Sequence, residues 1–300
     1  MSRMPSVSVI LPVFNGAATI ADTLRALLTQ ADPPQPLEIV VVDNGSTDAT
    51  RDIVSSHSVT LLEEATRGPS AARNCGLRYA SGEVIAHLDA DTLPTRRWLA
   101  ELVAPFADAQ VHIAGGHTIT FRPTTPAQRY MSRSQVHDGE ASARHPVMPF
   151  VASLNMAVRR QSALAIGGWA EDMLTAEDVD FCHRILQAFP SRIAYQPNAL
   201  LFHRDRTTDE ALVRQAWGYG QGAAQLYRRY PHDLPWGARQ WWALAYKLSQ
   251  RVFTYAGTRI REPFGFTAAE DVEFALYDWR WTWWYWRGFV HRYRRDAQRT

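Results

Sequence analysis

The sequence predicts an α/β protein: a three-layer α/β/α fold with a mostly parallel central sheet, followed by a helical C-terminal region rich in aromatic and basic residues. Short β-branched runs alternate with amphipathic stretches from the N-terminus onward, which is typical of a parallel sheet covered by helices on both faces. Polar residues follow these runs at the strand ends, where open α/β sheets bind ligands. From Thr208 the pattern is helical, and eight of the eleven tryptophans lie at or beyond Trp236.

Residues that commonly begin or end helices mark the boundaries of the first four expected strands and helices. Ser46 is an expected N-cap, Pro69 suits a first helical turn, and Gly82 follows a helix where a left-handed residue is common. The expected strands are "VSVIL", "LEIVVV", "VTLL" and "EVIAHL", and the expected helices span residues 18–30, 47–56, 69–80 and 96–106.

The middle of the chain is less regular. Residues 122–149 contain prolines, histidines and arginines without a clear period, so we expect a long connection that is mobile or faces the substrate. A strand "FVASLNMAVR", two helices and strand-like pieces ending at His203 follow. The expected domains are a catalytic domain over residues 1–205, with halves at about 1–121 and 149–205, and a helical region over residues 206–300.

Composition excludes several classes of protein. With 300 residues, of which 46% are hydrophobic, the chain can bury a sizeable core. A net charge of +2 is too small to indicate a nucleic-acid partner. Cys75 and Cys182 lie far apart in expected helices, which indicates reduced thiols. The sequence has no apolar run of about 18 residues and no signal-peptide pattern, so we expect a cytoplasmic protein.

The stretch "VIAHLDADTLP" places two carboxylates, Asp89 and Asp91, directly after an apolar strand. In an extended backbone alternate side chains share a face, so both carboxylates would point the same way and would repel unless a cation lay beside them. Taken alone, the residues also fit a solvated turn ahead of a helix. Because Asn15 and Asp43 end neighbouring strands, three polar strand ends are expected at one crevice.

Five stretches occur in a fixed order: "VSVILPVFNG", "VVDNGSTD", "RGPSAARNCGLRYASGEVIAHLDADTLP", "NMAVRR" with "GGW", and "AEDVDFCHRI". In order and spacing they resemble the inverting family-2 glycosyltransferases of the GT-A fold, over roughly residues 7 to 205. The resemblance implies an enzyme that moves a sugar from a nucleotide-diphosphate sugar to the hydroxyl of a glycan, a lipid-linked or a small-molecule acceptor. It also implies a place in polysaccharide or cell-envelope biosynthesis.

The resemblance implies a divalent cation at the aspartate pair. By this resemblance Asp91 is a metal ligand, and Asp89 and Ala90 contact the nucleotide sugar; the cation neutralises charge on the leaving diphosphate. His203 ends "NALLFH", where the family often has another metal ligand, and a histidine that merely ends a strand is the alternative. An imidazole ligand favours Mn²⁺ over Mg²⁺.

The nucleotide is expected at the ends of the first two strands. The resemblance implies contacts from Pro12, Phe14, Asn15 and Asp43, although Asp43 before a glycine also fits a simple turn. Asn44 stands where many members have an aspartate that reads the base. Its amide can donate and accept, so UDP is favoured while dTDP and GDP stay open.

Arg73 and Asn74 lie in the helix after "GP", which the resemblance places near the nucleotide. A guanidinium can pair with a diphosphate in bidentate fashion, so Arg73 is expected to contact phosphate, with an arginine on the helix surface as the alternative. Asn74 is expected to be structural.

Inversion at the anomeric carbon is a single displacement, so a carboxylate must accept the proton of the acceptor hydroxyl. By the resemblance this base is Asp178, and Glu177 holds the loop or touches the acceptor; two acids that simply open a helix are the alternative. Asp180 is expected on the helix surface. Gly168 and Trp169 are expected on the acceptor side, with the indole as a stacking platform for a sugar.

Two other functions compete with this enzyme. A nucleotide-sugar-binding module without turnover would be expected to lose Asp91 or Asp178, and both are present. A sugar nucleotidyltransferase would want a basic, glycine-rich first loop, whereas "LPVFNGAATI" has no basic residue.

The stretch "DWRWTWWYWRGFVHRYRR" is not explained by the resemblance. On a helical period Trp279, Trp283, Trp286 and Val290 share one stripe, with arginines beside it at seven-residue spacing. The stripe fits peripheral contact with the inner face of the cell membrane or a homodimer interface. Packing on the catalytic domain is the alternative.

Overall fold

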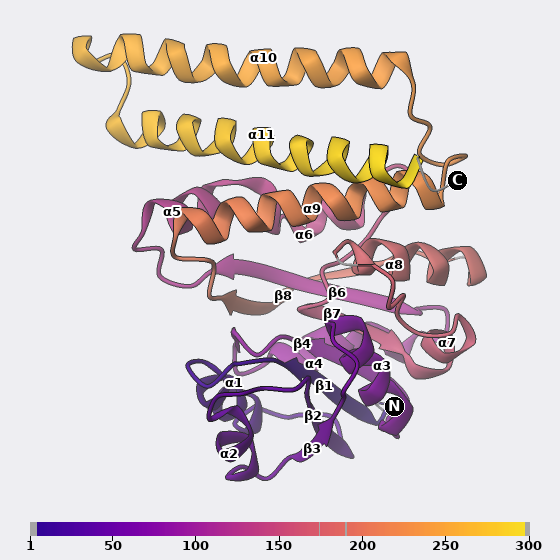
Figure 1. The fold of residues 1–300 in the computed structure, drawn as a ribbon. Helices are drawn as coiled ribbons and strands as arrows, with labels where there is room; N and C mark the ends of the chain where they lie inside the picture. The colour runs from indigo at the N-terminus through magenta and orange to yellow at the C-terminus, as the bar shows by residue number, and fades with distance from the viewer. Residues whose placement is uncertain (1–4, 174, 190, 298–300) are drawn as a thin grey trace. The chain divides into compact units, whose positions relative to one another are not determined.

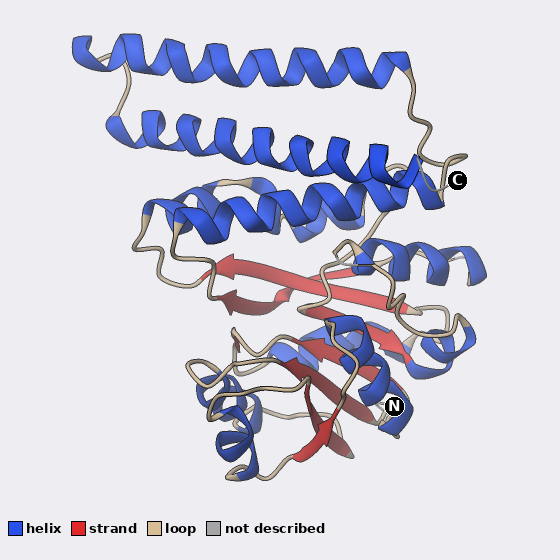
Figure 2. Cartoon of the chain, in the orientation of Figure 1, coloured by secondary structure: helices blue, strands red, loops and turns tan. Residues whose placement is uncertain are grey.

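The computed structural model describes residues 5–173, 175–189 and 191–297, which divide into two compact units. Figures 1 and 2 show a sheet with flanking helices in the first unit and long helices in the second. The first unit comprises residues 1–119, 138–172 and 177–204, and the second comprises residues 120–137, 173–176 and 205–300.

The first unit is built on an eight-stranded sheet with the order β3-β2-β1-β4-β7-β6-β8-β5. Strand β1 pairs in parallel with β2 and β4, and β2 pairs in parallel with β3. The pairs β4–β7, β6–β7 and β5–β8 are antiparallel. The strands are β1 (Val7–Val13), β2 (Leu37–Asp43), β3 (Thr60–Glu63), β4 (Val84–Leu88), β5 (Thr92–Pro94), β6 (Ile113–Thr120), β7 (Asn155–Arg159) and β8 (Ala194–His203).

The α/β class is confirmed, but the sheet is mixed rather than mostly parallel. Helical crossovers link β1, β2, β3 and β4, and such connections permit parallel neighbours. The second half of the sheet pairs strands that are distant in sequence, such as Ile85 of β4 with Val158 of β7. Hydrophobic periodicity predicts a strand but not the direction of its partner.

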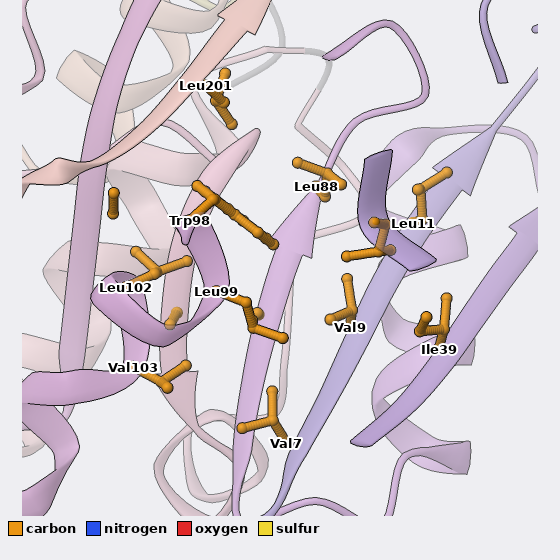
Figure 3. Packing of buried hydrophobic residues seen from close by; sticks show 14 of the residues in the cluster. Val7, Val9, Leu11, Ile39, Leu88, Trp98, Leu99, Leu102, Val103 and Leu201 are labelled. Atoms are coloured by element: carbon orange, nitrogen blue, oxygen red, sulfur yellow. The ribbon is translucent and has the colours of Figure 1, made fainter. Parts of the chain in front are cut away.

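Alternate residues of β1 face two separate cores, which makes the first unit three-layered. Val7, Val9 and Leu11 pack with residues of α1 and α4 on one face (Figure 3). Ile10 packs with residues of α3, α7 and α8 on the other. The helices of this unit are α1 (Ile20–Leu28), α2 (Thr50–Ser55), α3 (Pro69–Tyr79), α4 (Trp98–Val103), η1 (Ala104–Ala107), α6 (Gly139–Ala143), α7 (Arg160–Ala165) and α8 (Glu177–Ala188).

The second unit is helical. Helix α11 packs against both α9 and α10. None of the helices within the described residues is both long enough and apolar enough to cross a membrane. The helices of this unit are α5 (Pro126–Arg133), η2 (Gln135–His137), α9 (Asp209–Arg229), α10 (Ala238–Arg261), η3 (Glu262–Phe264) and α11 (Ala269–Ala297).

The expectation of an irregular connection over residues 122–149 is wrong, because α5, η2 and α6 lie there. Thr125 caps α5 and forms a capping box with Gln128, a pattern visible in the sequence as "TPAQ". Tyr130 and Met131 are buried in an apolar cluster with residues of α9 and α11. Burial of one face therefore stabilises a helix that is too short for its period to stand out.

The tryptophan stripe of α11 lies largely inside the helical unit. Trp279 stacks on Tyr255 of α10, with ring centroids 6.2 Å apart. Trp286 lies 5.8 Å from the ring of Trp236. Helix packing therefore accounts for these two indoles, while Trp283 is exposed.

Helices α9 and α11 approach each other closely at a glycine. A Cβ atom added at Gly220 would lie 1.8 Å from the carbonyl oxygen of Tyr285, so Gly220→Ala should separate two helix backbones and lower the free energy of unfolding by about 3 kcal/mol. The matched control is Gly257→Ala in α10, where a Cβ would meet nothing within 4 Å. This control should stabilise the helix by up to about 1 kcal/mol. Urea unfolding measures both, and equal stability of the two variants would contradict this packing.

Candidate active site

The loop after β1 is held by the loop after β2. Asn15 adopts a left-handed φ of +50°, which asparagine tolerates better than most residues. Its side-chain oxygen accepts a hydrogen bond from the backbone N–H of Thr47 (2.8 Å), and its own N–H donates to the hydroxyl of Ser46 (2.9 Å). The next N–H groups, of Gly16 and Ala17, donate to the side chains of Thr50 and Asp48. Asn15 therefore organises the loop.

Asp43 and Asn44 hold the turns that follow β2, and their expected nucleotide contacts stay a prediction. Asp43 is fully buried; its carboxylate accepts hydrogen bonds from the N–H of Ser46 and pairs with Arg51 at 2.8 Å. The Asn44 amide donates to the carbonyl oxygens of Glu64 and Thr66 and accepts from the N–H of Gly68. Both side chains therefore help to hold the turns at the end of β2.

An exposed aromatic and an arginine stand beside these turns. Phe14 is 51% exposed, and the Arg67 guanidinium lies 4.1 Å from the centre of its ring. Arg67 also donates to the carbonyl oxygen of Asn44 (3.0 Å), which fixes it at the end of β2. The motifs do not predict this place for Arg67, although it stands directly before "GP". Pro12 lies within β1, paired with Val42.

The two aspartates of "DAD" lie in a turn rather than in an extended strand. The chain turns between β4 and β5, and the hydroxyl of Thr92 donates to the carbonyl oxygen of Asp89 (2.7 Å). The carbonyl oxygen of Ala90 accepts from the buried Thr23 hydroxyl (2.9 Å). The Asp89 carboxylate pairs with Arg73 and the Asp91 carboxylate lies beside His203, so the two have different partners.

Arg73 joins Asp89 to the acids of α8. Its side chain is only 3% exposed and donates to Asp89 Oδ1 at 3.1 Å and to Glu177 Oε1 at 3.0 Å. Both terminal nitrogens thus meet carboxylates, and the burial of the side chain rules out the alternative of an arginine on the helix surface. The expected contact of Arg73 with phosphate stays a prediction. Arg73 ties together two segments that the resemblance assigned to donor and base.

An aromatic layer lies below this bridge. Trp169 stacks on Phe181, with centroids 4.1 Å apart and planes 6° apart, and the Arg73 guanidinium lies 5.0 Å from its ring centre. His87 meets the indole edge-on, and its ring nitrogens have no hydrogen-bond partner among the described residues. Burial, together with the charge of Arg73, holds the pKa of His87 well below its usual range, so the ring is neutral.

Trp169 is therefore not a stacking platform for a sugar. Its side chain is 3% exposed and belongs to the core under Arg73. Asn74 holds this segment by donating to the carbonyl oxygen of Trp169 (2.9 Å) and accepting from its N–H (2.8 Å), a structural role as expected. Gly168 has a φ of +75°, and a Cβ there would lie 2.5 Å from the Asn74 amide oxygen. The "GGW" signal thus reflects packing.

Asp178 lies in the first turn of α8, next to Glu177. It is half-buried, and its Oδ1 accepts a hydrogen bond from the N–H of Val179 (2.8 Å). Burial, with the neighbouring Glu177 charge, raises the pKa of Asp178 to about 7. A carboxylate with a pKa near neutrality is a much better proton acceptor than an ordinary aspartate.

The prediction that Asp180 lies on the helix surface is wrong. It is fully buried and pairs with Arg184, one helical turn later, at 2.8 Å. The period of α8 places it beside Phe181 and Cys182, which are also buried.

Asp91 and His203 are brought together by the antiparallel pairing of β5 with β8. Thr92 is the register partner of His203, and Asp91 Oδ1 lies 3.6 Å from His203 Nε2. Two ligand atoms at this separation can bind one cation, since each bond to the metal is about 2.0–2.2 Å long. A carboxylate oxygen with an imidazole nitrogen is a donor set that fits a divalent cation.

Comparison with known proteins gives close sequence relatives. A glycosyltransferase, AglE, of Haloferax volcanii is 31% identical over 234 residues, covering 75% of each chain. The pre-mycofactocin glycosyltransferase of Mycobacterium tuberculosis is 33% identical over 236 residues, covering 75% of this chain but 48% of its own length. The chain therefore spans about half the length of the mycobacterial relative.

Solved structures share the fold. A Pyrobaculum calidifontis mannosyltransferase, PcManGT, in complex with GDP-Man and Mn²⁺, matches with a TM-score of 0.60 at 22% identity, covering 98% of this chain and 75% of that one. Glucosyl-3-phosphoglycerate synthase of M. tuberculosis, in complex with Mn²⁺, UDP and glucosyl-3-phosphoglycerate, matches with a TM-score of 0.55 at 21% identity, covering 75% of this chain and 80% of that one.

The mixed sheet and these neighbours define the GT-A fold. The model of glycosyl transferase family 2 matches residues 8–167. The chain belongs to that family and is a nucleotide-sugar glycosyltransferase.

Proposed function

We propose that the protein is an inverting, metal-dependent glycosyltransferase in which Asp178 is the general base. The observation that carries this proposal is the chain of contacts from Asp178 and its neighbour Glu177 through Arg73 to Asp89. It couples the proton acceptor to the turn that precedes the metal ligand. A base and a leaving-group site held at a fixed separation are what a single displacement requires.

In the proposed reaction an acceptor hydroxyl attacks the anomeric carbon while Asp178 accepts its proton. The bond from the anomeric carbon to the diphosphate oxygen breaks in the same step, so the configuration inverts. Glu177 is held by Arg73 and orients the acceptor beside Asp178. The raised pKa of Asp178 supports this role because a stronger base assists attack by a neutral hydroxyl.

Asp91 and His203 are the residues proposed to hold the cation. A bound divalent cation supplies positive charge to the departing diphosphate. The imidazole donor favours Mn²⁺ over Mg²⁺. Asp89, with one carboxylate oxygen on Arg73, is proposed to contact the nucleotide sugar near Ala90.

The exposed ring of Phe14 and the guanidinium of Arg67 are proposed to hold the base by stacking. Stacking alone selects bases weakly, so the donor is a UDP, dTDP or GDP sugar, with UDP favoured. The proposed acceptor is a hydroxyl of a glycan, a lipid-linked sugar or a small molecule in envelope or polysaccharide synthesis. Cys75 and Cys182 are free thiols, which supports a cytoplasmic site of reaction.

A donor panel tests the proposal. UDP, dTDP and GDP sugars are incubated with Mn²⁺ and candidate acceptors, nucleotide release is measured, and the anomeric configuration of the product is read by NMR. We expect release from one nucleotide class and an inverted product. Retention of configuration would remove Asp178 as base, and donor binding without turnover across the panel would favour the inactive binding module.

Loss of a metal ligand should change metal dependence before it changes stability. Asp91→Ala and His203→Ala should each raise the Mn²⁺ concentration for half-maximal rate by about tenfold or more, because each removes one donor atom. Metal titration of the rate measures this, and thermal unfolding of the metal-free protein serves as the control for folding. If His203→Ala had the metal dependence of the parent, His203 would not be a metal ligand and would simply end β8.

A further inference from the structure

Helix α10 presents apolar side chains on two opposite faces. One face packs on α11 through Leu244, which is buried, and Tyr255, which stacks on Trp279. Arg251 on this side pairs with Asp278 at 2.9 Å. These contacts with α11 fix which side of the helix is turned outward.

The outward face carries four large apolar residues at a helical spacing. Trp242, Tyr246, Phe253 and Ile260 are 77%, 65%, 74% and 67% exposed. At 100° per residue they fall within about 40° of one another, so they form one stripe, which we call the α10 stripe. Phe264 and Phe266, just beyond the helix, are also exposed, at 72% and 80%. Exposed aromatic residues in such a row are unusual for a surface that meets only water.

The charged residues of α10 itself are all basic, and Arg259 pairs with Glu262 just beyond the helix at 2.9 Å. Residues 238–261 contain five basic residues and no acidic residue. Arg239, Lys247 and Arg261 fall on one flank of the stripe at the same helical period, and Arg259 falls on the other. The five basic residues of the helix are Arg239, Lys247, Arg251, Arg259 and Arg261.

We propose that the α10 stripe lies in the interface of an anionic lipid bilayer, with α10 parallel to the membrane plane. Tryptophan and tyrosine suit the headgroup level, phenylalanine and isoleucine enter the acyl boundary, and the flanking cations meet lipid phosphates. A helix of 24 residues would lie along about 36 Å of the surface.

A second copy of the chain fits this surface less well. Two α10 helices packed antiparallel would bring the cationic flank of one against that of the other, without an acidic residue of either helix to offset the charge. An anionic surface complements both the stripe and its flanks. The proposed surface thus differs from the α11 stripe of Trp279 and Trp286, which is used in helix packing.

Vesicle cosedimentation of the full chain tests the proposal. We expect binding to phosphatidylcholine vesicles that contain phosphatidylglycerol to exceed binding to pure phosphatidylcholine by about tenfold at low salt, and to weaken at high salt. The double variant Trp242→Ser, Phe253→Ser should lose about tenfold or more of this binding. The matched control is Trp283→Ser in α11, whose indole is also exposed, and it should bind as the parent does.

Three results would overturn the proposal: no binding to anionic vesicles at low salt, unaltered binding by the double variant, or loss of binding by Trp283→Ser alone. Sedimentation velocity without vesicles gives a further arm. A parent dimer that the double variant abolishes would assign the α10 stripe to a second copy instead. Because Trp242 and Phe253 are largely exposed, thermal unfolding of the double variant should match that of the parent. None of these measurements depends on turnover.

Discussion

Asp178→Asn should lower turnover by a factor of about 10² to 10⁴ while leaving nucleotide binding close to that of the parent. Asparagine keeps an oxygen for the N–H of Val179, which Asp178 accepts at 2.8 Å, but it cannot take a proton from the acceptor. Steady-state rates and calorimetric binding of the nucleotide separate the two effects. Full turnover by this variant would show that another group is the base.

The parent should also show an acid limb in its rate profile. The pKa of Asp178 is raised to about 7 from an ordinary 3.8, and only the ionised carboxylate can accept a proton. The rate constant kcat/KM should therefore fall about tenfold per pH unit below about pH 7. A limb near pH 4 would contradict the raised pKa.

Asp178→Asn should raise the free energy of unfolding, although it lowers turnover. An acid whose pKa is raised on folding destabilises the folded state once it is ionised, so this cost is absent below about pH 4, grows up to about pH 7 and is complete above it. At pH 8 the free energy of unfolding of Asp178→Asn should thus exceed that of the parent by about 1–3 kcal/mol. Near pH 4 the two free energies should be equal. Asp52→Asn, an exposed acid in the first turn of α2, is the matched control and should change little at either pH.

The sequence predicted the parts of the fold that depend on local pattern. The helix beginning at Pro69 and the strands β1, β2 and β4 fall where alternation and punctuation place them. The direction of β7 could not be predicted, because it depends on the pairing of β7 with β4 across about 70 residues. Helix α5 was missed, because burial of Tyr130 and Met131 rather than a long period stabilises it.

In the site, too, the sequence predicts which residues take part but not which side chains and backbone groups surround them. The motifs predict roles for Asp91, Asp178 and His203, and the structure brings Asp91 and His203 within 3.6 Å. The motifs did not predict that Arg73 is buried between two carboxylates. They also did not predict that the Asn44 amide forms hydrogen bonds with three backbone groups. Such partners come from segments distant in sequence, so motif spacing does not specify them.

Arg73→Gln should lower both stability and turnover, because it removes the cation between Asp89 and Glu177. Glu177 is 12% exposed in its side chain and would be left half-buried without its partner at 3.0 Å. Breaking a buried pair of this kind typically costs about 3–5 kcal/mol. Turnover should fall by on the order of 10², because the acids of α8 would lose the contact that positions them relative to Asp89.

The pH profile separates this role from a general loss of folding. The Arg73 charge lowers the pKa of Asp178, so its removal should raise that pKa and move the acid limb of kcat/KM to higher pH. Arg78→Gln on the same helix is the matched control: its side chain is 63% exposed and lies 3.5 Å from Glu64, and both stability and the limb should be unchanged. Adding Glu177→Gln to Arg73→Gln should restore part of the stability, since the unpaired carboxylate is then gone. If Arg73→Gln matched Arg78→Gln in stability and in pH profile, the bridge would have no part in positioning the base.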